Sequence, residues 1–134
     1  MSEGEGEARP CVLVVEDEWL IADLLQAMLT ELGYEVIGPA FSVAQALKLI
    51  QEQAPDAALL DVSLDEAKSF AVADAMASRG APFLFLTGYV NANLPARYRT
   101  SRILSKPVSI TDLRAPLAGM ARPGRASDGA ATGG

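Results

Sequence analysis

Cysteine is almost absent from this 134-residue chain, which holds only Cys11. One thiol can form neither a disulfide framework nor a structural zinc site within a single chain, so a reducing compartment is expected. Basic residues are scarce as well: 11 Lys and Arg stand against 17 Asp and Glu, and the net charge is −6. The one basic cluster, Arg97, Arg99 and Arg102, is expected to be a solvated loop. This balance argues against nucleic acid as a partner.

Long apolar runs are also missing. No stretch is long enough to span a bilayer, and residues 1–9 are rich in Glu and Gly, which is unlike a signal peptide. We therefore expect a soluble cytoplasmic protein with no membrane partner. A hydrophobic fraction of 50% supplies one core, assigned to residues 10–120, and leaves no room for a second catalytic or DNA-binding domain. Residues 1–9 and 121–134 are expected to be disordered tails.

Short apolar runs alternate with amphipathic segments along residues 10–120. The runs predict five strands, at 11–15, 34–37, 57–61, 82–86 and 103–104, the second closed by Gly38-Pro39. Helical spacing predicts helices over 20–32, from Ser42 past Ile50, over 69–79, and from Ser109 to Met120. Residues 90–100 have little periodicity, so the fourth helix is expected to be short or irregular. The pattern predicts an α/β fold, a doubly wound five-stranded parallel sheet of the flavodoxin-like (βα)5 type with strand order 2-1-3-4-5.

Polar groups follow four of these strands. Glu16 and Asp17 come after the first strand, Asp61 after the third, Thr87 after the fourth and Lys106 after the fifth. The first and third strands are neighbours in the predicted order, so their carboxylates should converge and repel one another. Mg²⁺, which prefers oxygen ligands, would relieve that repulsion. Taken singly, Asp61 could instead cap a turn, and Glu16 and Asp17 could favour a helix N-terminus through its dipole.

Four motifs occur in order: Val14-Val15-Glu16-Asp17-Glu18, Leu59-Leu60-Asp61-Val62, Phe85-Leu86-Thr87-Gly88 and Ser105-Lys106-Pro107. Together they resemble the receiver domain of two-component response regulators, and the resemblance covers Val12 to about Met120. It implies that Asp61 accepts a phosphoryl group from a histidine kinase or phosphotransfer protein, without the chain being a turnover enzyme.

The resemblance also implies roles for the other residues of the set. Glu16, Asp17, Asp61 and the backbone carbonyl of Ser63 would hold Mg²⁺, while Lys106 and Thr87 would stabilise the charge of the transferring group. It further implies a cis bond between Lys106 and Pro107.

The segment Pro82 to Tyr89 is similar to a subgroup of single-domain receivers with the motif Pro-Phe-x-Phe-Ala-Thr-Gly-Tyr, from which this chain departs at Leu86. Such receivers are associated with histidine kinases of the HWE/HisKA2 type. With no output domain expected, the phosphorylated form would bind another protein or act as a phosphate sink. Ile103 stands where many receivers have a switch aromatic, so ordering of the segment around Tyr89 is the expected switch.

Three other functions compete with this one. A haloacid-dehalogenase-type phosphatase needs a second acid two positions after the nucleophile, where this chain has Ser63. A flavodoxin needs a phosphate-binding loop after the first strand, where the acids at 16–18 would repel phosphate. A receiver-fold adaptor that binds protein without being phosphorylated stays open.

Overall fold

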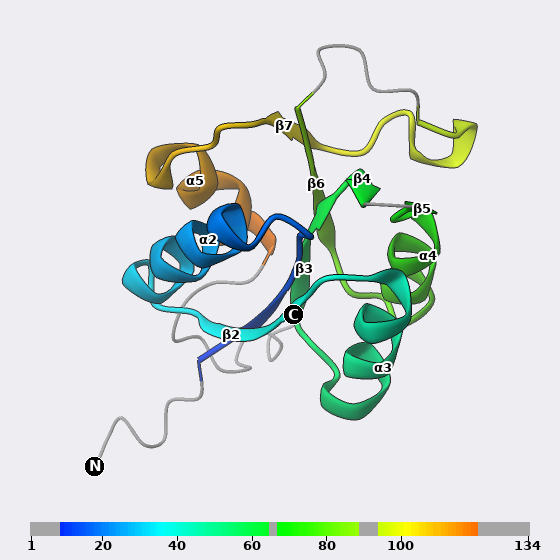
Figure 1. Cartoon of the computed structure of the whole chain (residues 1–134), viewed down its shortest axis with the longest axis horizontal. Helices are drawn as coiled ribbons and strands as arrows, with labels where there is room; N and C mark the ends of the chain where they lie inside the picture. The colour runs from blue at the N-terminus through cyan, green and yellow to red at the C-terminus, as the bar shows by residue number, and fades with distance from the viewer. Residues whose placement is uncertain (1–8, 65–66, 89–93, 121–134) are drawn as a thin grey trace.

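The computed structural model describes residues 9–64, 67–88 and 94–120. Apart from Arg9, both predicted tails lie outside these residues, as does Tyr89 with the switch expected there. A central parallel sheet is covered by α2 and α5 on one face and by α3 and α4 on the other (Figure 1). None of the helices described combines the length and the apolar composition that crossing a bilayer requires.

The main sheet contains five strands, and all its neighbours pair in parallel. The order across the sheet is β2-β1-β3-β6-β7, which confirms the predicted order 2-1-3-4-5 when these five strands are counted along the chain. Their bounds are β1 Cys11–Val15, β2 Glu35–Ala40, β3 Ala57–Asp61, β6 Phe83–Thr87 and β7 Ile103–Ser105. The central strand β3 is buried along its whole length because helices cover both faces of the sheet.

Four α-helices occupy the predicted places: α2 Trp19–Glu31, α3 Val43–Gln53, α4 Phe70–Ser78 and α5 Ile110–Met120. Both predicted cap residues act as N-caps: the Gln45 amide donates to Ser42 Oγ at 3.1 Å, and Ser109 and Asp112 exchange reciprocal bonds. Only the 3₁₀ helix η1, Ala96–Tyr98, is seen between β6 and β7 in the part described. The expectation of a short or irregular fourth helix is therefore confirmed for those residues.

Strand β2 runs further than predicted. It passes through Gly38-Pro39 to Ala40, which pairs with Val15 across an irregularity in the register. The chain can pass there because Gly38 has φ 98°, and a Cβ on it would lie 2.8 Å from the Ala40 nitrogen. The extension also fixes the start of the segment that leaves β1, because the Ala40 carbonyl accepts a 3.0 Å hydrogen bond from the amide of Glu16.

The apolar spacing that predicted α2 does not correspond to one buried face. Ala22, Leu25 and Leu29 are buried, whereas Leu20 and Leu24 are 57% and 54% exposed. A two-layer cover of the sheet leaves room for only part of the circumference of a helix, so some leucines at helical spacing face outward.

Two short strands that were not predicted follow Asp61. Residues Ser63–Leu64 (β4) and Ala67–Lys68 (β5) pair antiparallel, with Ser63 opposite Lys68. Strands of two residues are too short to show a hydrophobic period, which is why the sequence pattern missed them.

Candidate functional site

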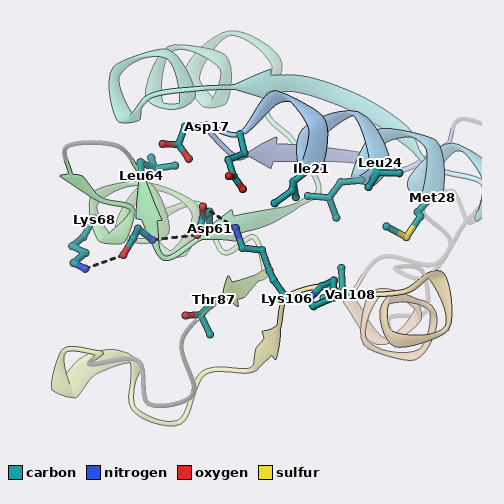
Figure 2. A pocket seen from close by; sticks show the side chains of 15 residues that line it. Asp17, Ile21, Leu24, Met28, Asp61, Leu64, Lys68, Thr87, Lys106 and Val108 are labelled. Carbon is teal, nitrogen blue, oxygen red and sulfur yellow. Dashed lines mark hydrogen bonds and ion pairs between the residues drawn. The ribbon is translucent and has the colours of Figure 1, made fainter.

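Four strands of the sheet deliver polar side chains to its carboxyl edge. The parallel register places the ends of β1, β3, β6 and β7 side by side, with Asp61 opposite Leu86 and Thr87 opposite Ser105. One pocket at this edge is lined by predicted site residues from these elements and from β4: Asp17, Asp61, Ser63, Thr87 and Lys106 (Figure 2). Glu16 lies beneath, fully buried. The predicted convergence of strand ends is thus present in the structure.

The three carboxylates form one cluster. Glu16, Asp17 and Asp61 each offer an oxygen, and these oxygens lie within 4.8 Å of one another. Glu16 has no exposed surface and Asp61 is 5% exposed. Three acidic oxygens at this spacing make a donor set that fits a hard divalent cation such as Mg²⁺. Ser63 lines the adjoining wall, and its amide donates to Asp61 Oδ1 at 3.3 Å.

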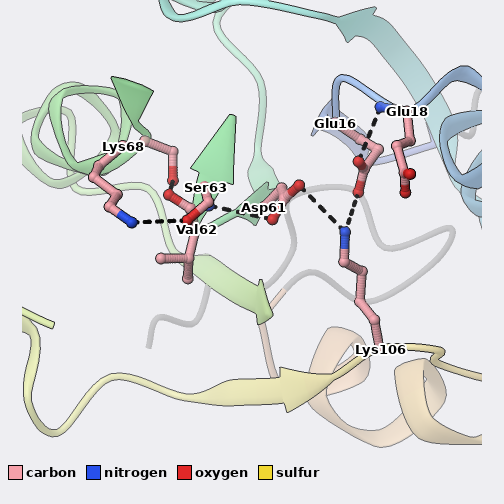
Figure 3. Close-up of polar contacts among 8 residues, drawn as sticks. Glu16, Glu18, Asp61, Val62, Ser63, Lys68 and Lys106 are labelled. Carbon is pink, nitrogen blue, oxygen red and sulfur yellow. Dashed lines mark hydrogen bonds and ion pairs between the residues drawn. The ribbon is translucent and has the colours of Figure 1, made fainter. Parts of the chain in front are cut away.

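Lys106 supplies a positive charge to this cluster. Its ammonium lies 3.0 Å from Glu16 Oε1 and 3.2 Å from Asp61 Oδ2, so that it bridges the two buried acids (Figure 3). The Lys106–Pro107 bond is cis, as predicted. Lys106 pairs with two of the three carboxylates in the cluster, which keeps an excess of negative charge when all three are ionised.

Burial sets the protonation of the deepest acid. It raises the pKa of Glu16 to about 7, because the loss of solvation outweighs the hydrogen bonds from the Glu18 amide and from Lys106. For Lys106, burial alone would lower the pKa, but the bond to Glu16 and the charge of Asp61 outweigh it and raise the pKa. Lys106 is therefore a cation at neutral pH, while the charge of Glu16 depends on what else occupies the site.

Thr87 ends β6 at the same edge. It is 3% exposed, lines the pocket, and accepts a 2.8 Å hydrogen bond from the Lys106 amide through its carbonyl. This bond ties the end of β6 to the start of the segment that carries Lys106. The hydroxyl and the ammonium thus reach the pocket from two neighbouring strand ends.

Two features of the pocket were missed from the sequence. Lys68, on the β5 strand, lines the wall beyond Ser63 and donates to Ser63 Oγ at 2.9 Å. The opposite wall is apolar and comes mainly from α2, with Val108 added: its residues are Ile21, Leu24, Leu25 and Met28. The exposed Leu24 on α2 is therefore a pocket residue, which helical spacing alone could not distinguish from core.

Comparison with known proteins places this geometry in a family. The profile described as "Response regulator receiver domain" matches residues 12–118. The transcriptional regulatory protein PdtaR of Mycobacterium tuberculosis is 37% identical over 106 residues, which cover 76% of this chain and 52% of PdtaR. The phyllosphere-induced regulator PhyR of Methylorubrum extorquens is 31% identical over 79% of this chain and 41% of its own length. The chain thus spans about half the length of the curated relatives it matches.

Solved structures agree with these relatives. SdrG from Sphingomonas melonis Fr1 is 38% identical, with a TM-score of 0.74 over 83% of this chain and 95% of SdrG. A BeF3-activated conformation described for SdrG from Pseudomonas melonis Fr1 has the same identity and a TM-score of 0.71, with the same coverage of both chains.

Proposed function

This chain belongs to the response regulator receiver domain family, and we propose that it accepts a phosphoryl group on Asp61 in a Mg²⁺-dependent reaction. One observation carries the proposal: Asp61 lies at the end of a buried central strand, 3.2 Å from a lysine and grouped with two further acids. A purely structural aspartate would not need two acidic neighbours. A relative described in a BeF3-activated conformation adds support.

The donor is proposed to be the phosphohistidine of a histidine kinase, for which the HWE/HisKA2 type is the candidate, or of a phosphotransfer protein. A carboxylate oxygen of Asp61 forms a bond to phosphorus while the phosphorus–nitrogen bond to the imidazole breaks. The electron pair of that bond leaves with the imidazole nitrogen, and the product on Asp61 is an acyl phosphate. No proton has to be removed from Asp61, because the ionised carboxylate is the nucleophile.

The other residues of the pocket would stabilise the negative charge on the phosphoryl oxygens. Glu16, Asp17, Asp61 and the Ser63 carbonyl would hold Mg²⁺, whose chemistry when bound is to neutralise charge on the phosphoryl oxygens and orient them. Lys106 holds Asp61 Oδ2 before transfer and is placed to pair with a phosphoryl oxygen afterwards. Thr87 offers a hydroxyl at the neighbouring strand end, which is suited to hydrogen-bond a second phosphoryl oxygen.

Phosphorylation would then change how this domain binds other proteins, or it would draw phosphoryl groups from a kinase as a sink. Receiver domains interact with kinases and with other proteins, and both roles use that property. No turnover of an external substrate is proposed.

The test is labelling with acetyl phosphate and Mg²⁺, followed by intact-protein mass measurement. Wild-type protein should gain one phosphoryl group that is stable in acid and lost in base. The variant Asp61→Asn should gain none, whereas Asp23→Asn, which removes an exposed carboxylate on α2, should label like wild type. Equal labelling of Asp61→Asn would refute the assignment, and a wild-type chain that never labels would favour the adaptor function.

A further inference from the structure

The hairpin that follows Asp61 brings a second lysine to the pocket. Ser63 and Lys68 face each other across β4 and β5, and the Lys68 ammonium donates to Ser63 Oγ at 2.9 Å. The amide of Ser63 in turn donates to Asp61 Oδ1. Figure 3 shows that Lys68 and Lys106 approach from opposite sides, with Asp61 between them. The chain has three lysines in all, and these two line the same pocket.

The ammonium groups of the two lysines have different partners. Lys106 is 15% exposed and is committed to two carboxylates, so most of its charge is already compensated. Lys68 is exposed, and within the part of the chain that the structure describes it donates to a neutral hydroxyl. Lys48, by contrast, forms an ion pair with Glu52 on the surface of α3. Among the described residues, Lys68 is held by a hydroxyl and not by a carboxylate, which keeps its charge available for an anion.

An anionic donor needs such a charge at this place. The pocket has more acid than base among its lining and underlying residues, so bound Mg²⁺ and the lysines must together offset the repulsion of an anionic donor. A cation on the outer side of Asp61 offsets that repulsion where Lys106, held deeper by Glu16 and Asp61, cannot. The bond to Ser63 Oγ holds the ammonium beside a residue of the pocket wall.

We propose that Lys68 is a substrate-binding residue that attracts the anionic phosphoryl group of the donor to the mouth of the pocket, an inference that rests on the proposed function. It predicts that loss of the charge slows capture of the donor, roughly three- to tenfold, as one screened charge at the edge of a pocket can supply. Once the donor is bound, the transfer step itself should be little changed.

The experiment measures phosphorylation rate against donor concentration for wild type, Lys68→Gln, Lys68→Arg and the matched surface control Lys48→Gln. Acetyl phosphate and phosphoramidate serve as donors, because acetyl phosphate carries more negative charge at neutral pH. Lys68→Gln should lower the second-order rate constant for acetyl phosphate about three- to tenfold and for phosphoramidate less. Raising the ionic strength should shrink the difference. Lys68→Arg should stay within about twofold of wild type, and Lys48→Gln should not differ from it.

The result that would overturn the inference is a Lys68→Gln rate equal to that of Lys48→Gln. An equal loss for both donors that is insensitive to salt and also present in Lys68→Arg would overturn it too, by assigning Lys68 a purely structural role. Thermal unfolding of each variant checks that the fold is intact. A wild-type chain that takes no phosphoryl group from either donor would instead overturn the proposed function, and this inference with it.

Discussion

Two clusters in this domain each combine carboxylates with a basic side chain, but one cluster is buried and the other is exposed. At the sheet edge, Lys106 lies between Glu16 and Asp61, both almost fully buried. On the outer surface, Arg97 of η1 forms a forked pair with Asp74 of α4 at 2.9 and 3.0 Å, with both side chains about half exposed.

The surface cluster is balanced. Asp74 accepts two bonds from Arg97 and another from the hydroxyl of Tyr98, and these bonds lower the pKa of Asp74. One carboxylate faces one guanidinium, and solvent can reach the exposed parts of both side chains. The cluster links η1 to α4, beside a group of aromatic rings in which Tyr98 contacts Phe70 and Phe85.

In the buried cluster the acids outnumber the cation, and burial determines whether Glu16 is protonated. Glu16 also accepts a hydrogen bond, from Lys106, yet its pKa rises to about 7 because burial removes the solvation of its charged form. An ion pair alone therefore does not settle the charge of a carboxylate. At the sheet edge, excess negative charge under poor solvation is a state that a bound divalent cation can relieve.

The largest expected effect comes from removing the one cation of the buried cluster. Lys106→Met leaves Glu16 and Asp61 uncompensated, and the free energy of unfolding at pH 8 in chelator should fall by about 3 kcal/mol. Urea unfolding measures it. The matched variant Lys48→Met, on the exposed face of α3, should change it by less than about 0.5 kcal/mol. Similar losses in the two variants would mean that the burial of its carboxylate partners does not make Lys106 more important to stability than an exposed lysine.

The next effect is a pH dependence from Glu16. In the folded chain the pKa of Glu16 is about 7, whereas its ordinary value is 4.5. Folding at a pH between 4.5 and 7 is therefore accompanied by uptake of a proton. The stability of wild type relative to Glu16→Gln should therefore be greatest below pH 4.5, decline as the pH rises, and level off above about 7. The total change should be about 3 kcal/mol, measured by urea unfolding in chelator. A relative stability that rises with pH would contradict the assignment to burial.

A smaller effect should follow from Mg²⁺. Binding to the folded chain alone adds about 1.4 kcal/mol of stability at a tenfold excess over Kd, seen as a rise in the unfolding midpoint. Asp17→Asn should weaken the rise, while Asp23→Asn should leave it unchanged. Trp19 is 71% exposed and is not among the pocket residues, so a thermal shift suits this measurement better than tryptophan fluorescence. An undiminished midpoint shift in Asp17→Asn would remove that residue from the metal site.

The smallest effect should come from the surface cluster. Asp74→Asn should cost about 1 kcal/mol or less, because exposed ion pairs contribute little, and phosphorylation of Asp61 should proceed at the wild-type rate. Urea unfolding and the labelling assay give the two values. A loss above about 2 kcal/mol would show that this cluster resembles the buried one after all.

Much of the buried cluster could be predicted from the sequence, because strand ends follow from apolar runs. The burial of β3 follows from its uninterrupted apolar residues, and the parallel order then brings Asp61 beside Glu16 and Asp17. Residues whose positions depend on contacts across the chain could not be predicted. Arg97, expected in a solvated loop, pairs with Asp74, 23 positions away, and no local pattern indicates such a pair.

The remaining errors are also matters of tertiary context. Gly38-Pro39 indicates a strand end by local rules, but pairing of Ala40 with Val15 carries β2 onward. Lys68 gave no signal, because its place in the pocket depends on a hairpin of two-residue strands.

The assignment of Asp61 as the phosphoacceptor is tested most directly by locating the modification. The protein is phosphorylated with a histidine kinase or acetyl phosphate in Mg²⁺, reduced with borohydride and digested. Reduction converts an aspartyl phosphate to homoserine, which peptide mass spectrometry assigns to one position. We predict homoserine at position 61 and nowhere else, and none when Mg²⁺ is chelated. Homoserine in place of Asp17 instead, or none anywhere after labelling of the intact protein, would contradict the assignment.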